Sequence, residues 1–192
     1  MGRTVLVVGG GGREHALSIG LFESPSVDSV HVAPGNAGTS QIAPNHPVSA
    51  GDVGGQVALA QSLGADLVVV GPEAPLVAGL SDALRAVGIP SFGPHADGAM
   101  LEGSKDFAKQ VMLDLGIPTA GVQHLTQETD LDKAIDLWGS PWVVKRDVLA
   151  GGKGVLVTEN RDEALEFIRS SIASDGMVLL EEFLSGEEAS ML

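Results

Sequence analysis

The chain has 192 residues, of which 44% are hydrophobic and none is cysteine, and its formal net charge is −14. That length suits one large domain, or one domain and part of another, and the missing cysteines exclude disulfides and thiolate metal sites. The negative charge argues against a nucleic-acid partner, which requires a basic surface.

Apolar runs alternate with segments of helical spacing in the first half of the chain. The run at the N-terminus is too short for a signal peptide or a membrane span, so we expect a cytoplasmic protein without membrane contact. Strands are expected at 3–9, 29–34, 65–75 and 89–94, and helices at 13–24, 53–64 and 76–88. Strands separated by helices of this length predict a parallel sheet.

The pattern changes near residue 95, and we expect a domain boundary between 94 and 104. Two helical pieces follow, with Ser104 as the N-cap of the second. Further strands are expected at 121–126, 141–147, 154–158 and 177–184, with helices at 130–138 and 161–173. The fold class is therefore α/β, divided into domains at 1–103 and 104–192.

Four consecutive glycines, Gly9 to Gly12, separate the first strand from the first helix, and Arg13 follows them. A loop in this position directs backbone N–H groups and the helix dipole toward a phosphate. The dinucleotide fingerprint fits poorly, because Glu14 stands where its third glycine belongs and no acid ends the second strand. A tight turn without a ligand is a further alternative, although four glycines exceed what a turn requires. We favour a loop that holds one phosphate of a ligand smaller than NAD.

Two more loops, "PGNAG" at 34–38 and "GPEAP" at 71–75, follow strands at the same predicted sheet edge. Asn36 and Glu73 could hydrogen-bond ribose hydroxyls or an amine there. Ordinary turn chemistry explains either loop alone. The convergence of three loops with one arginine favours a binding site.

The histidines do not suggest a metal site, because their positions lack metal-ligand spacing. His15 is interpreted as a structural residue on the sheet-facing side of the first helix, whose residues Leu17, Leu21 and Phe22 have helical spacing. No metal ligand is therefore predicted within this chain.

A second phosphate candidate is "KRDVLAGGKGV" at 145–155, where glycines and a lysine lie between two strands. Such a hairpin can fold over a triphosphate and donate backbone N–H groups to it. It is not the nucleotide loop that ends in Lys-Ser/Thr. An exposed hairpin tip is the alternative, but Lys145 on an apolar strand needs an anionic partner or a route to water.

The motifs "VVGGGGREHAL", "VAPGNAGT", "VVVGPEAPLVAGL", "FGP", "LEGSKDFAK" and "GIPTA" resemble, in this order, the phosphoribosylamine–glycine ligase family. "WVVKRDVLAGGKGV" and "EEFLSGEEAS" extend the resemblance over essentially the whole chain. That family belongs to the ATP-grasp ligases of purine synthesis. The resemblance implies a Rossmann-like parallel-sheet N-terminal domain, followed by the small α+β subdomain of an ATP-grasp fold.

The resemblance also implies an activity: the ATP-dependent ligation of glycine to 5-phosphoribosylamine, with small-molecule partners and with Mg²⁺ or Mn²⁺ held outside this chain. The implied contacts to substrate phosphate and ribose are Gly9, Gly11, Gly12, Arg13, Asn36, Gly38, Pro72 and Glu73. The implied contacts to ATP are Lys105, Lys145, Gly151, Gly152, Lys153, Gly154, Glu181, Phe183, Leu184 and Glu188. Phe183 and Leu184 belong to a segment that resembles the adenine hinge, whose alternative is a solvated strand end. Catalytic residues are not assigned.

Two departures from the family pattern are visible. Arg146 and Val148 stand where the family has small residues and glycine, and the segment 170–178 is several residues shorter than usual. We expect the fold to survive, with reduced cover over ATP. Because the family's large ATP-grasp subdomain follows the hinge, we expect these 192 residues to bind ligands without completing the ligation alone. Another ATP-grasp ligase and a non-catalytic phosphate-binding fragment are the alternative hypotheses.

Overall fold

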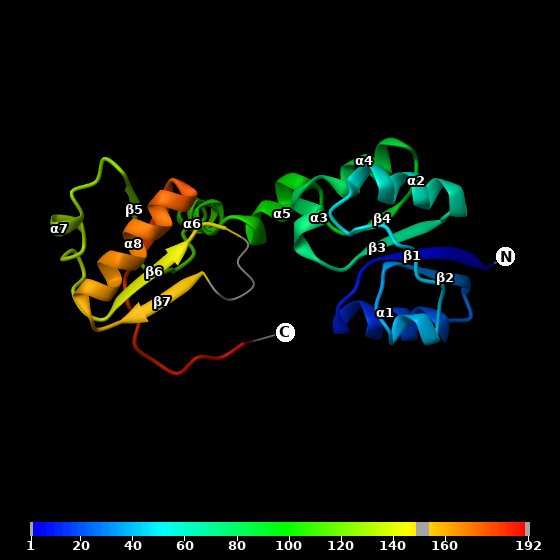
Figure 1. Cartoon of the computed structure of the whole chain (residues 1–192), viewed down its shortest axis with the longest axis horizontal. Helices are drawn as coiled ribbons and strands as arrows, with labels where there is room; N and C mark the ends of the chain where they lie inside the picture. The colour runs from blue at the N-terminus through cyan, green and yellow to red at the C-terminus, as the bar shows by residue number, and fades with distance from the viewer. Residues whose placement is uncertain (1, 149–153, 191–192) are drawn as a thin grey trace. The chain divides into compact units, whose positions relative to one another are not determined.

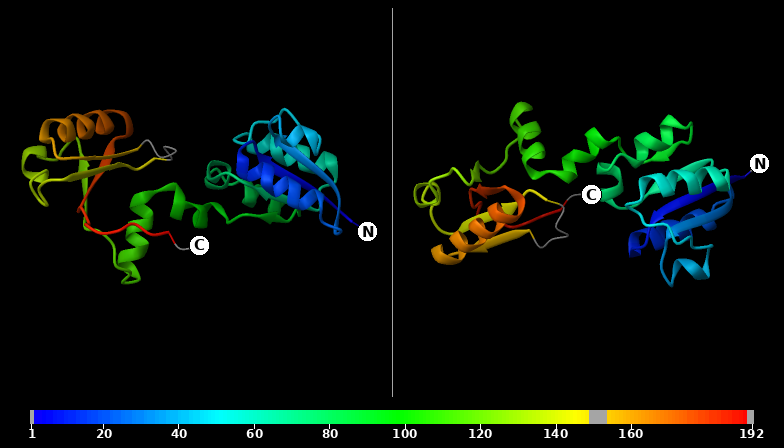
Figure 2. Two further views of the ribbon diagram at one scale, coloured as in Figure 1. Left: turned by 90° about the horizontal axis from the view of Figure 1, so that it is seen from below. Right: turned by 45° about the horizontal axis from the view of Figure 1, so that its top comes forward.

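The computed structural model describes residues 2–148 and 154–190. The chain divides into two compact units, Met1–Gly103 (unit 1) and Ser104–Leu192 (unit 2) (Figures 1 and 2). Within the described ranges, no helix combines the length and the hydrophobicity that crossing a bilayer requires.

Unit 1 contains the predicted parallel sheet, with strand order β2-β1-β3-β4. Its central strand β1 places Val7 opposite Val32 on one side and Val69 on the other. The strands are β1 (Arg3–Gly9), β2 (Val27–Pro34), β3 (Leu67–Val70) and β4 (Ser91–Phe92). The helices are α1 (Gly12–Phe22), η1 (Thr39–Gln41), α2 (Val53–Leu63), α3 (Glu73–Val77), α4 (Leu80–Ala86) and α5 (Ala96–Gly103).

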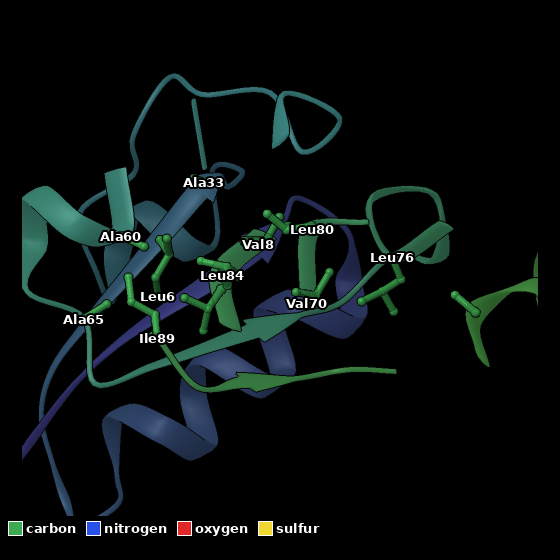
Figure 3. Close-up of a cluster of buried hydrophobic side chains, with 12 residues drawn as sticks. Leu6, Val8, Ala33, Ala60, Ala65, Val70, Leu76, Leu80, Leu84 and Ile89 are labelled. Carbon is green, nitrogen blue, oxygen red and sulfur yellow. The ribbon is translucent and has the colours of Figure 1, made fainter. Parts of the chain in front are cut away.

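The sheet of unit 1 is buried on both faces, which explains its continuous apolar runs. On one face, Leu6 and Val8 of β1 join Leu80 and Leu84 of α4 and Ala60 of α2 in one cluster (Figure 3). The alternate residues of β1 belong to a second cluster, whose buried members are Val5, Val7, Val30, Val32, Ala43 and Val69.

Two helices of unit 1 differ from what the sequence indicates. The helix expected at 76–88 is divided into α3 and α4, because Gly79 takes a left-handed conformation with φ of 86° and caps α4. Of the apolar residues at helical spacing in α1, Leu21 packs against the second cluster, whereas Leu17 and Phe22 are 37% and 60% exposed. The fully buried residues of α1 are Glu14 and Ser18.

Unit 2 contains an antiparallel sheet with strand order β5-β8-β6-β7. As predicted, Leu165, Ile168 and Ile172 of α8 pack against this sheet, where they meet Val144 and Leu180. The strands are β5 (Val122–Thr126), β6 (Trp142–Arg146), β7 (Val155–Thr158) and β8 (Met177–Glu181). The helices are α6 (Lys105–Asp114), α7 (Leu131–Ala134) and α8 (Arg161–Asp175).

Element ends in unit 2 differ from expectation at two places. The helix expected at 130–138 is only α7, and the Ile135 carbonyl beyond its end accepts the Trp142 indole N–H at 2.6 Å. Strand β8 ends at Glu181 rather than 184, at the point where its neighbour β5 begins with Val122. The predicted N-cap is confirmed, since Ser104 Oγ accepts the N–H of Phe107 at 3.0 Å.

Candidate functional site

Three loops of unit 1 meet at the carboxyl ends of β1, β2 and β3. The N–H of Gly35 donates to the Gly9 carbonyl at 3.0 Å, and the N–H of Gly71 donates to the Val8 carbonyl at 3.0 Å. The side chain of Asn36 donates to the Gly10 carbonyl at 3.0 Å. These bonds hold the glycine loop, the PGNAG loop and the GPEAP loop together at one sheet edge.

Glu14 is the residue of this edge that sequence reasoning missed. Its carboxylate is buried and accepts the N–H of Gly11 at 2.6 Å, which completes half of a capping box. A methyl group at Gly9 would lie 2.6 Å from Glu14 Cγ, and one at Gly11 would lie 2.9 Å from Oε2. A methyl group at Gly71 would overlap the same carboxylate. The glycines therefore make room for the side chain of Glu14. The position of Glu14 just after the glycine loop is the sequence signal that could have identified it.

Gly10 and Gly12 have different surroundings. A methyl group at Gly10 would lie 2.7 Å from the carbonyl oxygen of Gly35, so this glycine permits the close approach of two loops. At Gly12, the first residue of α1, a methyl group would meet no heavy atom within 4 Å. The first turn of a helix has N–H groups without intrahelical acceptors. Gly12 is thus the exposed position where a ligand can approach them.

Arg13 lies beside this position and is held by two carboxylates. Its Nη2 donates to Glu73 Oε1 at 3.0 Å, and its Nε lies 3.4 Å from Glu14 Oε1. The hydrogen bond to Glu73 raises the pKa of Arg13, with a further contribution from Glu14. The pKa of Glu73 is lowered by its own backbone N–H and by Arg13. With 58% of its side chain exposed, Arg13 keeps a fixed cation at the mouth of the three loops.

The remaining predicted residues of unit 1 shape the loops. Asn36 Oδ1 accepts the N–H groups of Gly38 and Thr39 at 2.7 and 3.0 Å, so its amide orders the PGNAG loop. A methyl group at Gly38 would overlap the ring of His15, so His15 lies against this loop. Pro72 caps α3, which begins at Glu73. A cavity of about 270 Å³ adjoins the GPEAP loop. It is lined by Gly71, Glu73, Leu76, Pro94, Gly98, Ala99, Leu101 and Glu102.

In unit 2, Lys145 has the anionic partner that its apolar strand predicts. Its Nζ donates to Glu181 Oε2 at 2.8 Å, and Glu181 is only 4% exposed. Lys109 of α6, which sequence reasoning missed, lies 3.3 Å from the same oxygen. Lys105 and Lys109 are one helical turn apart on α6 and therefore share a face of the helix; this spacing is the sequence signal that could have identified Lys109.

Lys105 lies where β6 ends. Its Nζ donates to the Val148 carbonyl at 3.1 Å, and its backbone N–H donates to Asp147 Oδ1 at 2.5 Å. Asp147 also accepts the Ser104 hydroxyl at 2.9 Å and thereby ties the start of α6 to the end of β6. Of the predicted hairpin residues, Gly151, Gly152 and Lys153 lie outside the described residues, whereas Gly154 is buried.

The two departures from the family pattern are accommodated locally. Arg146 forms a bidentate ion pair with Asp175, in which Nε donates to Oδ2 at 2.6 Å and Nη2 donates to Oδ1 at 2.8 Å. This pair lowers the pKa of Asp175 to about 2. The shortened segment has only Gly176 between α8 and β8, with φ of 82°. After β8, Phe183 and Leu184 are 45% and 62% exposed, and Glu188 is exposed.

The described residues do not supply a metal site. Across residues 2–148 and 154–190, no group of three or more histidine, cysteine, aspartate or glutamate side chains is arranged to hold an ion.

Comparison with known proteins matches both units. The family described as phosphoribosylglycinamide synthetase, N domain, matches residues 3–102, and its ATP-grasp (A) domain matches 103–192. The phosphoribosylamine–glycine ligase of Streptomyces coelicolor is 51% identical over 187 residues, covering 97% of this chain and 44% of the relative. The crystal structure of that ligase from Thermotoga maritima has a TM-score of 0.76 at 32% identity, covering 96% of this chain and 44% of that one.

A more distant structure, an ADP complex of N5-carboxyaminoimidazole ribonucleotide synthetase, has a TM-score of 0.73 at 20% identity and shows likeness of fold alone. It covers 95% of this chain and 47% of its own. The chain spans less than half the length of the curated relatives it matches. Because the N-domain model alone accounts for more than half of these residues, the chain belongs to the phosphoribosylglycinamide synthetase family.

Proposed function

We propose that this chain provides the phosphoribosylamine-binding unit and part of the ATP-binding unit of a phosphoribosylamine–glycine ligase acting in the cytoplasm. The observation that carries the proposal is the tandem match of the two family domains to residues 3–192. The complete reaction joins glycine to 5-phosphoribosylamine and gives glycinamide ribonucleotide, ADP and phosphate.

The chemistry is a carboxylate activation followed by amide formation. An oxygen of the glycine carboxylate attacks the terminal phosphorus of ATP, giving an acyl phosphate and ADP. The amine of 5-phosphoribosylamine then attacks the acyl carbon, and phosphate leaves with the bonding electron pair. Magnesium, when bound with ATP, neutralises charge on the triphosphate. The chain's own contribution is to bind and orient the phosphate-bearing ligands.

In unit 1 the ligand is a sugar monophosphate. Its phosphate meets the first-turn N–H groups of α1 at Gly12, with Arg13 beside it. Glu73 and the ordered loop around Asn36 lie close enough to these groups to meet ribose hydroxyls or the amine. Gly9, Gly11, Gly38 and Pro72 support these loops. The buried Glu14 argues against NAD. A dinucleotide loop has glycine at this position, whereas here the side chain of Glu14 lies against Gly9, Gly11 and Gly71.

In unit 2 the ligand is ATP. Lys105, Lys145 and Gly154 meet its phosphates, and the further proposed contacts Gly151, Gly152 and Lys153 lie outside the described residues. Phe183 and Leu184, both exposed residues that follow β8, offer their backbone groups to the adenine edge. Glu188 is the proposed ribose acid, because the carboxylate of Glu181 is already engaged by lysine.

Calorimetry on this chain tests the two binding sites separately. Ribose 5-phosphate and ADP are each expected to bind, and NAD is expected not to bind. Tight NAD binding without ribose 5-phosphate binding would refute the assignment of unit 1. Absence of ADP binding would refute the assignment of unit 2.

A chimaera tests the ligase activity at the length of the curated relatives. Residues 1–192 replace the matching segment of the Streptomyces coelicolor ligase, to which they are 51% identical. ADP formation is expected only when glycine and 5-phosphoribosylamine are present together. A folded chimaera that binds ADP but never responds to the amine would favour a binding role without catalysis. The parent ligase, assayed in parallel, is the control.

A further inference from the structure

Two lysines share one carboxylate oxygen in unit 2. Lys145 of β6 lies 2.8 Å, and Lys109 of α6 lies 3.3 Å, from Oε2 of Glu181. The Glu181 side chain is 4% exposed, and the lysines are 10% exposed at Lys109 and 29% exposed at Lys145. One carboxylate thus faces two ammonium groups, which leaves the trio with one net positive charge.

The hydrogen bonds of the two lysines show where that charge is available. Lys109 Nζ also donates to Thr119 Oγ1 and to the Ala120 carbonyl, both at 2.8 Å. Together with the ion-pair contact to Glu181, these hydrogen bonds place three oxygen atoms around the Lys109 ammonium group, which has three N–H donors. Within the part of the chain that the structure describes, Lys145 Nζ has Glu181 as its partner, and Lys145 is the more exposed of the two lysine side chains. The surplus charge is therefore accessible at Lys145.

The trio lies away from the main core of unit 2. Lys145 and Glu181 alternate along β6 and β8 with Val144 and Leu180, which pack in the core cluster of α8. Lys145 and Glu181 therefore occupy the opposite face of the sheet, where α6 contributes Lys109. The same helix contributes Lys105, the second predicted phosphate contact.

We infer that Lys109 is a positioning residue, which takes a share of the Glu181 charge and so leaves Lys145 free to bind a nucleotide phosphate. The inference rests on the proposed function, in which Lys145 meets the phosphates of ATP. Without Lys109, Glu181 and Lys145 would neutralise each other, and the buried carboxylate would draw the remaining ammonium onto itself. Lys145 would still be present, but Glu181 would neutralise its charge and no positive charge would remain for the phosphate.

Charge balance supplies the first test. Lys109→Met removes the surplus charge, whereas the double variant Lys109→Met/Glu181→Gln restores it at Lys145. Calorimetry with ADP is expected to show a loss of about ten- to a hundredfold for the single variant and recovery in the double variant. Adenosine, which has no phosphate, is expected to bind both variants as it binds the wild type. Lys133→Met, at an exposed lysine of α7, is the matched control.

A purely structural role would weaken adenosine and ADP alike and would show no recovery in the double variant; either result overturns the inference. Thermal unfolding establishes that each variant is folded before it is titrated. Should Lys109→Met not fold, Lys109→Arg retains the cation and is expected to keep ADP affinity, so its loss would count against the inference.

A measurement without nucleotide separates this inference from the proposed function. Acetylation by a water-soluble N-hydroxysuccinimide ester, followed by mass spectrometry, reports the access of reagent to Lys145. We expect labelling of Lys145 to slow by about threefold or more in Lys109→Met and to recover in the double variant. Equal labelling in all three proteins overturns the inference, even if ADP binds. If the wild type binds no ADP, the proposed nucleotide site fails, while labelling still decides whether Lys109 positions Lys145.

Discussion

Gly12→Ala separates a ligand-binding glycine from a packing glycine within one loop. Gly12 is the first residue of α1, and a methyl group there would meet no heavy atom within 4 Å. Its φ is not among the positive values of the chain, so alanine can adopt the native backbone. If the folded structure alone explains the loop, alanine should be tolerated.

The magnitude follows from chain entropy. Alanine in place of an unstrained glycine stabilises a protein by about 0.4–1 kcal/mol, because the unfolded chain has fewer conformations to lose. For a unit of about one hundred residues this corresponds to a rise in Tm of roughly 2–8 °C. Binding should change in the opposite direction. A methyl group at the first-turn N–H groups blocks the approach of a phosphate, and we expect ribose 5-phosphate affinity to fall by about tenfold or more.

The assay is thermal unfolding with calorimetry on the same protein samples. Gly71→Ala is the contrasting control, because its methyl group would overlap the buried carboxylate of Glu14 and should lower Tm. Gly12→Ala with raised Tm and weakened ribose 5-phosphate binding supports a ligand at this loop. Raised Tm with unchanged binding would refute the reasoning, since the phosphate would then lie elsewhere.

Three further predictions concern unit 2. Lys145→Ala should weaken ADP binding by about ten- to a hundredfold, whereas Lys133→Ala should leave it unchanged; equal effects would remove Lys145 from the site. Arg146 depresses the pKa of Asp175 to about 2, so the pair stabilises the fold above about pH 4 and loses its effect as the pH falls toward 2. Asp175→Asn should therefore be less stable than wild type at pH 7 but approach it near pH 2, as urea unfolding at both pH values would show. Ile168→Ala, at a fully buried position of α8, should cost about 2–5 kcal/mol of unfolding free energy, and a cost below about 1 kcal/mol would contradict the core assignment.

The elements that the sequence predicts well have a simple burial pattern. Strand β1 is covered on both faces and therefore reads as one apolar run. Helix α8 places Leu165, Ile168 and Ile172 on one buried face, at the spacing that its sequence shows. Helix α1 lacks this pattern, since its buried residues are Glu14 and Ser18, and its packing face could not be predicted from hydrophobic spacing.

The site residues that sequence reasoning missed depend on partners far along the chain. Glu14 lies against Gly71, which belongs to another loop. The local glycine pattern shows Glu14 only as a mismatch to the dinucleotide fingerprint. Lys109 contacts Glu181, which is far from it in the sequence, near the C-terminal end of unit 2. Local patterns predicted that Lys145 required an anionic partner or a route to water, whereas the carboxylate that meets it lies on β8, which pairs with β6.

The two units hold their proposed phosphate-binding cations differently, and the difference bears on which groups bind the ligand. In both, a carboxylate fixes a long side chain during folding, so that less rotamer entropy is lost when the ligand arrives. Lys145 shares its carboxylate with Lys109 and keeps a surplus charge. Arg13 instead faces two carboxylates, Glu14 and Glu73, which together outweigh its charge. A phosphate in unit 1 must therefore draw more of its binding energy from the backbone N–H groups of α1, which is the reason that Gly12, rather than Arg13, is the decisive position to change.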